Sequence, residues 1–532
     1  ERSSKITLLE DGVMIAPAPY SNPAAYYFPT TMRMHTVEVL KGAPLLRHGP
    51  QTTGGIVNLV STPIPDRDAG GVTAIVGEYN SRDLHAHYGG KRGNVGWLVE
   101  TVQRDSDGFK DIDRSGRDAG YDIEDYLIKL SWEGEGQKLL FKAQYSEEVS
   151  NETYLGLSLD DYRENPYRRY AASAMGLMDW DRTQVELAWS RAVSDDLRFR
   201  SVIYHHYLQR SWTKFNGFAS GIDPHALLQT APTTGLGAVY MAILRGDEDT
   251  ATDDQLLRIG TNARTFHSYG LQNSARWEAR FGEVDSRLDM GIRLHADDVG
   301  RLHTENLFDM RGGELVCADR ELVTTTDSRA MARALAAYVQ EDLGYRGLHV
   351  IPSVRVEAVQ TQLDKVGEES QEAVTRVHAL PGLGILQSVG HWLDAFAGLH
   401  RGYSPVAPGQ PEEVEPELSW NYEGGFRLDM GGRTAELVAF FNDYQNLTGQ
   451  CSMSGGCGAD EVDRQFNGGD VWIYGAELVV GDRFVLPADL SLSVDLSYSL
   501  TESRFQTAFV SDFPQFDVVS IGDSLPYVAR HQ

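Results

Sequence analysis

Apolar and polar residues alternate along much of the chain after residue 66, and this two-residue period restricts its fold more than any other feature. In residues 490–500, every even-numbered residue is Leu, Val or Tyr, while the odd-numbered ones are serines and one aspartate. Residues 126–132 and 141–146 repeat the pattern. Successive side chains of a strand point to opposite faces, so the pattern predicts strands with one apolar and one polar face.

Short and long connections alternate between the predicted strands. Tight turns are predicted near residues 91–94, 133–137, 193–196, 282–284, 344–347, 389–391, 430–433 and 487–489. Longer segments are predicted at residues 105–124, 147–181, 211–265, 296–328, 402–417, 448–472 and 501–526. Outer-membrane barrels pair short turns on one side with long loops on the other, and soluble sandwiches rarely do. We therefore predict an all-β fold, a transmembrane antiparallel β-barrel of about 17 strands, with another strand starting at Tyr527.

The composition agrees with a strand-rich chain. Its 532 residues include 53 Gly and 24 Tyr, only 23% are charged, and no apolar run reaches the 18 residues of a spanning helix. The negative mean hydropathy does not argue against a barrel, because lipid-facing and lumen-facing residues alternate along each strand.

The net charge of −28 argues against a nucleic-acid partner, because phosphate binding needs a basic face. Acidic residues cluster in predicted loops at residues 105–113, 160–161 and 412–417. We interpret them as solvated loop surface. A divalent-cation site is the alternative, although the spacing of a calcium loop is incomplete.

The three cysteines cannot all pair with one another. Cys451 and Cys457 enclose five residues, and a disulfide between them is expected, which would place this segment in an oxidising compartment. Metal binding would need further Cys or His close by. Cys317 is expected to be free.

Residues 37–61 join a short apolar strand, a Gly-bounded turn and a second strand that begins with Gly54-Gly55. Glycines at such positions allow positive φ or close backbone approach, as a small domain packed inside a tube requires. Upstream, Asp11-Gly12 between apolar residues is a hairpin signal. An ordinary hairpin is the alternative interpretation of residues 37–61.

These segments resemble the second half of the plug domain of TonB-dependent outer-membrane receptors. The resemblance implies that residues 1–66 are the C-terminal part of a plug lying inside the lumen, and that residues 67–532 form the barrel. The barrel of this family has about 22 strands. We therefore expect the chain to be truncated at both ends, with the signal peptide, the energy-coupling box and the early plug upstream, and the last strands downstream.

Among these receptors, the plug half is most similar to the ferric dicitrate (siderophore) receptor family. The residues that carry this resemblance are Ala18-Pro19-Tyr20, Pro23, Phe28-Pro29, Gly49-Pro50-Gln51, Gly54-Gly55-Ile56-Val57-Asn58 and Ile64-Pro65. Over the barrel the resemblance is looser and consists of the alternation and the order of the loops.

An anionic ferric chelate is recognised by planar arginine forks and amide donors. The resemblance implies ligand-binding roles for Arg258 and Arg264, at the return of a long loop to the barrel, and for Arg329, at the start of another strand. For each of them, an arginine of the surface or of the lumen wall is the alternative.

On the plug, the resemblance implies that Gln51 in the apex turn donates its amide to the ligand, with a plain turn residue as the alternative. Tyr20 and Tyr26 are expected to line an apical pocket. The alternative is that they pack the plug against the barrel. The family's ligand contacts from the seventh long loop are not matched, because residues 401–405 read Arg-Gly-Tyr-Ser-Pro.

The function implied by the resemblance is active import of a ferric chelate, ferric dicitrate or a similar anionic siderophore, across the outer membrane of a Gram-negative bacterium. The implied partners are the TonB–ExbB–ExbD energy-coupling complex and outer-membrane lipid and lipopolysaccharide, and the expected state is a monomer without cofactors of its own. Uptake of haem, cobalamin or an oligosaccharide, or a passive porin-like barrel, are the alternatives.

Catalysis is not expected, because the chain has no P-loop, His-Glu-x-x-His or Gly-x-Ser-x-Gly motif. A barrel enzyme such as a lipase would need a nucleophile and base pair that the sequence does not reveal. His205-His206 and His85-x-His87 could chelate a metal, but adjacent strand residues face opposite ways and the second pair lacks a third ligand. Structural roles are expected for these histidines.

Overall fold

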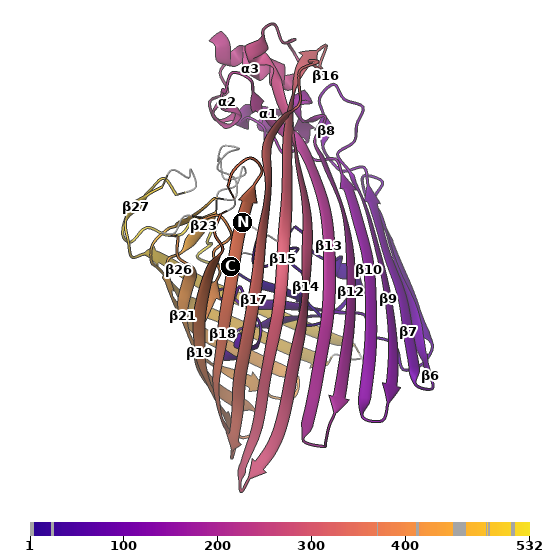
Figure 1. Ribbon diagram of the computed structural model, residues 1–532, viewed down its shortest axis with the longest axis vertical. Helices are drawn as coiled ribbons and strands as arrows, with labels where there is room; N and C mark the ends of the chain where they lie inside the picture. Colours follow the sequence, from indigo (N-terminus) through magenta and orange to yellow (C-terminus); the bar gives the residue numbers. More distant parts are fainter. Residues whose placement is uncertain are drawn as a thin grey trace.

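One antiparallel barrel dominates the molecule, and its strands run along the long axis in Figure 1. This computed structural model describes residues 5–22, 26–369, 371–410, 414–450, 464–485, 487, 490–511 and 516–532. Within them, seventeen long strands and the short β16 (Glu314–Cys317) follow one another around the ring in chain order, so the predicted fold class and strand number are confirmed. The long strands are β5 (Ala69–Val76), β6 (Arg82–Arg92), β7 (Val95–Ser106), β9 (Tyr121–Gly134), β10 (Gln137–Ser150), β12 (Leu177–Ala192), β13 (Leu197–Phe218), β14 (Leu257–Phe281), β15 (Val284–Arg311), β17 (Val323–Tyr345), β18 (Leu348–Lys365), β19 (Val374–Val389), β20 (Leu393–Ser404), β21 (Glu417–Asp429), β22 (Arg433–Gln445), β25 (Val471–Val485) and β26 (Ser491–Phe505).

The alternation along the strands separates a lumenal face from an outer face. In β9, Leu127 and Lys129 are buried inside the barrel, whereas Ile128, Leu130 and Trp132 are 44–47% exposed on its outside. Exposed apolar side chains on the outer face fit a wall that contacts lipid, as the sequence pattern predicts.

β5 and β26 are the first and last long strands of the ring. No paired residues join them among the described residues, and both strands are exposed on both faces over most of their lengths. Residues 530–532 extend the sheet beside β26, where the N–H groups of Ser499 and Thr501 donate to the carbonyls of Gln532 and Arg530, each at 3.0 Å. The further strand predicted from Tyr527 thus pairs three residues later than expected.

Four strands rise far above the others on the side of the long connections. The two ends of the predicted loop at residues 211–265 are strand, because β13 continues to Phe218 and β14 starts at Leu257. Most of the predicted loop at residues 296–328 is strand, because the β15–β17 ladder continues there and β16 adds to it. The prediction was wrong there because the alternation is lost. Phe215 and Ile259, on the face that points outward lower down, are also buried, against a cap of helices.

The cap contains α1 (Leu159–Glu164), α2 (Pro224–Thr230) and α3 (Gly235–Arg245), with the short elements β8 (Asp111–Ile112), β11 (Arg168–Arg169), η3 (Ala171–Ser173) and η4 (Asp253–Gln255). Figure 1 shows these helices gathered at one end of the barrel, beside β16. Their apolar side chains form a core of their own, including Tyr240, Ile243 and Leu244 of α3. No single described helix has the length and apolar character to cross a membrane, and α2 and α3 meet that test only as a pair bent by 104°.

Four strands between Thr7 and Ser61 form a separate small sheet in the order β2-β1-β4-β3. Its strands are β1 (Thr7–Glu10), β2 (Val13–Met14), β3 (Met34–Leu40) and β4 (Ile56–Ser61), with η1 (Thr31–Arg33) and η2 (Ala43–Arg47) between them. The predicted Asp-Gly turn joins β1 to β2, with Asp11 at φ 52° and Gly12 at φ 84°. We refer to residues 5–61 as the plug.

The plug lies inside the barrel, because its side chains contact strands all around the ring. Arg33 pairs with Asp125 of β9, Tyr20 bonds Glu357 of β18, and Tyr444 of β22 donates to the carbonyl of Thr53.

Two small hairpins, β23 (Thr448–Gln450) with β24 (Gln465–Asn467) and β27 (Phe509–Val510) with β28 (Val518–Val519), lie in the last long connections. Cys317 is exposed and free, as predicted. The predicted disulfide between Cys451 and Cys457 lies outside the described residues.

Candidate functional site

A buried network of alternating charges holds the plug against β9 and β10. Arg33 donates two hydrogen bonds to the Glu10 carboxylate, at 2.8 and 3.0 Å, and one to Asp125 at 2.8 Å. Lys142 of β10 donates to Glu10 at 2.6 Å and to Asp11 at 2.8 Å. Burial alone would raise the pKa of Glu10, but the cations of Arg33 and Lys142 hold it well below its usual range. We call these five residues the ionic lock.

Tyr20 fastens the plug to the opposite part of the wall. Its ring is fully buried, its hydroxyl donates to Glu357 at 2.9 Å, and Arg293 donates to the same hydroxyl at 2.7 Å. Asp297 of β15 accepts a hydrogen bond from the Tyr20 N–H at 2.8 Å. These contacts correspond to the packing alternative for Tyr20 and leave its hydroxyl engaged by the wall.

Gln51 is buried in the plug at 3% exposure. Its amide nitrogen donates to the Pro19 carbonyl at 2.5 Å, and its own backbone carbonyl accepts from Thr7 at 2.8 Å. The side chain therefore ties two plug segments together, and its predicted contact with a ligand stays a prediction.

A row of apolar side chains seals the plug against β13, β14, β15 and β17. Cross-strand pairing places them side by side, and Ala18 and Tyr27 of the plug pack against them; the row is Leu208, Phe266, Val299 and Ala330. Every side chain that shares their parity on these strands faces the lumen.

Directly above this seal, toward the cap, three arginines face the lumen side by side. Arg210 pairs with Arg264 across β13 and β14, and Arg264 pairs with Arg301 across β14 and β15. Arg210 and Arg264 are each 2% exposed, and Arg301 is half-buried. The row thus brings three guanidinium groups together on one face of the sheet.

The apex of the plug contacts the arginine row. The Arg264 guanidinium donates to the Tyr26 hydroxyl at 3.2 Å, and the Arg210 guanidinium lies 4.3 Å above the Tyr26 ring. In its hydrogen-bonded orientation, the Asn22 amide oxygen accepts from Arg264 at 3.0 Å and from Arg301 at 3.3 Å. Tyr26 is thus at the junction of plug and wall, in accord with both of its predicted roles.

Asn262 lies on β14 two residues closer to the cap than Arg264. It accepts hydrogen bonds from Arg210 at 2.9 Å and from Arg264 at 3.0 Å. Lys214 lies on the same lumenal face, with its ammonium 4.4 Å from the Trp212 ring and 4.5 Å from the Tyr154 ring. Cations, amides and aromatic rings therefore converge on the lumenal face between the plug and the cap.

The structure separates the three arginines predicted from the sequence. Arg264 lies in the arginine row. Arg258 is six residues away on the same strand, about 20 Å closer to the cap, where its guanidinium packs over Gly217.

Arg329 lies on the other side of the wall. Its neighbour Ala330 packs against the plug, so Arg329 faces outward, where it is 60% exposed and pairs with Asp298 at 3.2 Å. A predicted role in binding a lumenal ligand is not tested for either residue, but neither is brought to Arg264.

The sequence interpretation missed Arg210, Arg301 and Asn22. A long connection separates β13 from β14, so the register that pairs Arg210 with Arg264 cannot be read from spacing. The tight turn at residues 282–283, by contrast, fixes the register that pairs Arg264 with Arg301. The sequence did, however, indicate which face of β17 points into the lumen. The small side chains of that face alternate with larger residues; they are Ala330, Ala332, Ala334 and Ala336.

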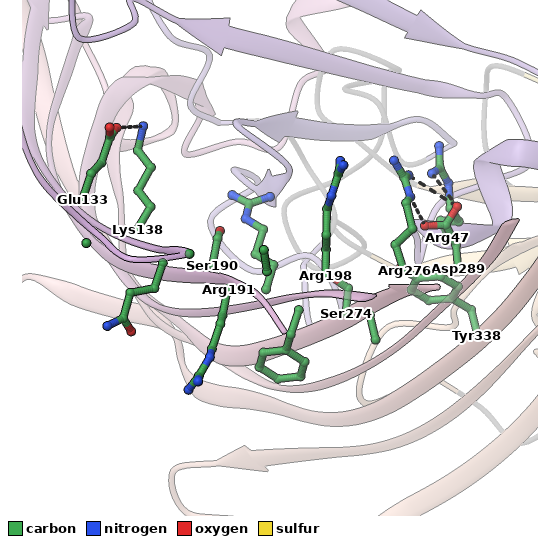
Figure 2. A pocket seen from close by; sticks show the side chains of 17 residues that line it. Arg47, Glu133, Lys138, Ser190, Arg191, Arg198, Ser274, Arg276, Asp289 and Tyr338 are labelled. Carbon is green, nitrogen blue, oxygen red and sulfur yellow. Dashed lines mark hydrogen bonds and ion pairs between the residues drawn. The ribbon is translucent and has the colours of Figure 1, made fainter. Parts of the chain in front are cut away.

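A second hollow lies at the other end of the lumen, next to the short turns. This cavity of about 580 Å³ is bounded by Arg47 of the plug and by residues that flank the turns of β9–β10 and β12–β13. Figure 2 shows Arg47 and Arg276 meeting around Asp289, with Arg198 pointing the same way and Arg191 pointing away. Arg276 donates to Asp289 at 2.8 Å, and the lining is predominantly basic.

The barrel matches a known protein family. The family model for the TonB dependent receptor-like beta-barrel matches residues 131–532. Among solved structures, the unliganded ferric citrate transporter FecA superposes with a TM-score of 0.76 at 18% identity, over 99% of this chain and 72% of that one.

The siderophore receptor PiuA from Acinetobacter baumannii gives a TM-score of 0.75 at 12% identity, over 99% of this chain and 76% of its own. The pyoverdine receptor FpvA from Pseudomonas aeruginosa PAO1, bound to pyoverdine, gives 0.72 at 14%, over 99% and 72%. At these identities the likeness concerns the fold. Because the family model covers more than half of its residues, the chain belongs to the TonB-dependent receptor-like β-barrel family, whose members are transporters of the Gram-negative outer membrane and not enzymes.

Proposed function

We propose that this receptor imports an anionic ferric chelate, ferric dicitrate or a similar carboxylate-rich siderophore, and that the arginine row of Arg210, Arg264 and Arg301 receives it. The observation that carries the proposal is the placement of three lumenal arginines in one cross-strand row directly above the plug. The names of the superposed receptors support iron as the cargo, since they refer to ferric citrate, a siderophore and pyoverdine.

The chemistry of the row suits a multivalent anion. Each guanidinium presents a rigid fork of N–H donors that matches a carboxylate, and three of them in adjacent strands span a ligand with several carboxylates. A neutral ligand such as cobalamin would not gain this match.

Tyr26 and Asn22 give the site a connection to the plug. Arg264 is buried against the plug apex. The present hydrogen bonds of Tyr26 and Asn22 with Arg264 and Arg301 would therefore be exchanged for bonds to the ligand. Occupancy of the row would thereby loosen contacts between the plug apex and the wall. The ionic lock does not touch the row, so its release is assigned to the TonB–ExbB–ExbD complex acting from the inner membrane.

The basic cavity at the short-turn end provides a second favourable position for an anion. Arg47 of the plug lies there with Arg198 and Arg276 of the wall. A chelate that has passed the plug therefore meets positive charge again before it leaves the lumen. Positive lining at both ends of the route favours an anionic cargo over a cationic one.

The test is a calorimetric titration of the purified full-length receptor with ferric dicitrate, a ferric catecholate siderophore, haem and cyanocobalamin. We expect an anionic ferric chelate to bind in the micromolar range or tighter, at least tenfold weaker in the Arg210→Ala/Arg301→Ala variant, and more weakly as salt is raised. Preference for cyanocobalamin, or binding of every ligand unchanged by the double substitution, would overturn the proposal. Growth on the same chelate as sole iron source, with and without the gene, then tests import.

A further inference from the structure

The lumenal face of β6 and β7 carries a cluster of metal-ligand side chains that lies apart from the arginine row. His85 and His87 lie two residues apart on β6 and therefore share a face, and Glu100 of β7 is directly opposite His87 in the ladder. One ligand atom of each residue lies within 4.8 Å of the others. The third ligand that the pair lacks on its own strand thus comes from the neighbouring strand.

The cluster has unused capacity for a ligand. Glu100 is only 5% exposed, yet its Oε2 atom has no hydrogen-bond partner within the part of the chain that the structure describes, and the same holds for the buried Nδ1 of His87. A buried carboxylate oxygen and a buried imidazole nitrogen without partners are each unfavourable. A cation placed between them would satisfy both.

The surroundings hold the ligands in place. His85 Nε2 lies 2.7 Å from Glu100 Oε1, and the Thr62 hydroxyl donates to the same oxygen at 2.7 Å. The His87 ring lies over Gly71 of β5, where an added Cβ would come within 2.9 Å of it. The glycine therefore leaves the room that the imidazole occupies.

We infer that His85, His87 and Glu100 bind one divalent transition-metal ion of the zinc type in the lumen, beside the segment that leads from the plug to the first barrel strand. Two imidazoles and one carboxylate are a ligand set that zinc accepts, leaving a fourth position for water. Small rotations of the side chains would bring the ligand atoms to the separations of about 3.3 Å that tetrahedral bonds of about 2.05 Å require. The ion would displace the proton between His85 and Glu100.

This site does not depend on the identity of the imported chelate. Thr62 connects it to the chain leaving the plug, so a bound ion would fasten that segment to β7 through Glu100.

The test is calorimetric titration of the full-length receptor, purified without a histidine tag, with Zn²⁺, and with Co²⁺ as a spectroscopic probe. We expect one ion per receptor with micromolar or tighter affinity and a cobalt spectrum of a site with nitrogen and oxygen ligands. His87→Ala and Glu100→Gln should each weaken binding at least tenfold, and Gly71→Ala should weaken it several-fold while keeping all three ligands.

The matched control is the His205→Ala/His267→Ala variant, which removes a histidine pair of similar spacing from the outer wall, with ring centroids 5.8 Å apart. It should leave the affinity unchanged. Circular dichroism and the heat-dependent gel mobility of the barrel confirm that each variant is folded. Absence of stoichiometric binding by the folded wild type, or binding unchanged in folded His87→Ala and Glu100→Gln, would overturn the inference.

Discussion

The plug contacts the barrel wall through two charged surfaces of opposite design. On the β9–β10 side, Glu10, Arg33 and Asp125 alternate in sign and satisfy one another inside a buried network. On the β13–β15 side, Arg210, Arg264 and Arg301 carry the same sign and lie side by side. Alternating charges satisfy one another within the ionic lock, whereas three guanidinium groups side by side present several N–H forks to an anion. The difference assigns cohesion to one surface and ligand reception to the other.

The largest expected effect comes from breaking the ionic lock at its centre. Arg33→Ala removes the cation of the buried Asp125 and leaves Glu10 with Lys142 alone, and we expect plug docking to lose about 3–5 kcal/mol. The urea concentration that exposes the backbone amides of β4 to hydrogen exchange measures this loss. Lys41→Ala, which removes the exposed pair with Glu477, is the control and should change docking by less than about 1 kcal/mol.

If Arg33→Ala altered ligand affinity while leaving docking unchanged, the division of labour between the two surfaces would be refuted.

Acid should release the plug through the same lock. Since the pKa of Glu10 is lower in the docked state than its ordinary value of about 4.3, the stability it provides is present above that value and is lost as the pH falls through the lowered pKa. We therefore expect hydrogen exchange at β4 to stay slow at pH 4.5 and to accelerate only at lower pH. In Arg33→Ala the acceleration should begin at higher pH, and coincident pH profiles for the two proteins would speak against the network.

A smaller effect is expected at Tyr20. Tyr20→Phe removes the hydroxyl that joins Glu357 and Arg293, and since both charged groups are buried, docking should weaken by about 1–3 kcal/mol. Arg293 and Glu357 lie 3.6 Å apart and can partly compensate, which favours the lower value. The same exchange measurement applies, with Tyr88→Phe on the exposed outer face as the control. Loss of ligand binding without loss of docking would instead support the predicted role of Tyr20 in an apical ligand pocket.

Much of the fold was readable in the sequence because its signals are local. The alternation in residues 126–132 depends only on which face meets lipid, and the Asp11-Gly12 turn depends only on backbone conformation. The same signal failed near Phe215, where the cap buries the outer face as well and removes the contrast on which the pattern depends.

The candidate site was only partly readable, because it depends on register between strands. Arg264 was found through a local resemblance, but its partner Arg210 becomes a neighbour only when two strands separated by a long connection are aligned. Arg301 pairs with Arg264, and Glu100 with His87, across tight turns whose register the sequence does carry, and these two pairings were missed. Arg329 was predicted to bind the ligand, but it is adjacent to the lumenal Ala330 on β17. Its side chain therefore lies on the outer face of the wall.

The most direct test of the central claim compares Arg264→Ala with Arg329→Ala. Both arginines were predicted from the sequence to bind the ligand, and the structure places one in the row and the other on the outer face. For the anionic chelate that binds the wild type most tightly, Arg264→Ala should raise Kd by about 10- to 100-fold, the loss of a charge-assisted contact, while Arg329→Ala should leave it within about twofold. Equal effects of the two substitutions, or an unchanged Kd in Arg264→Ala, would contradict the account.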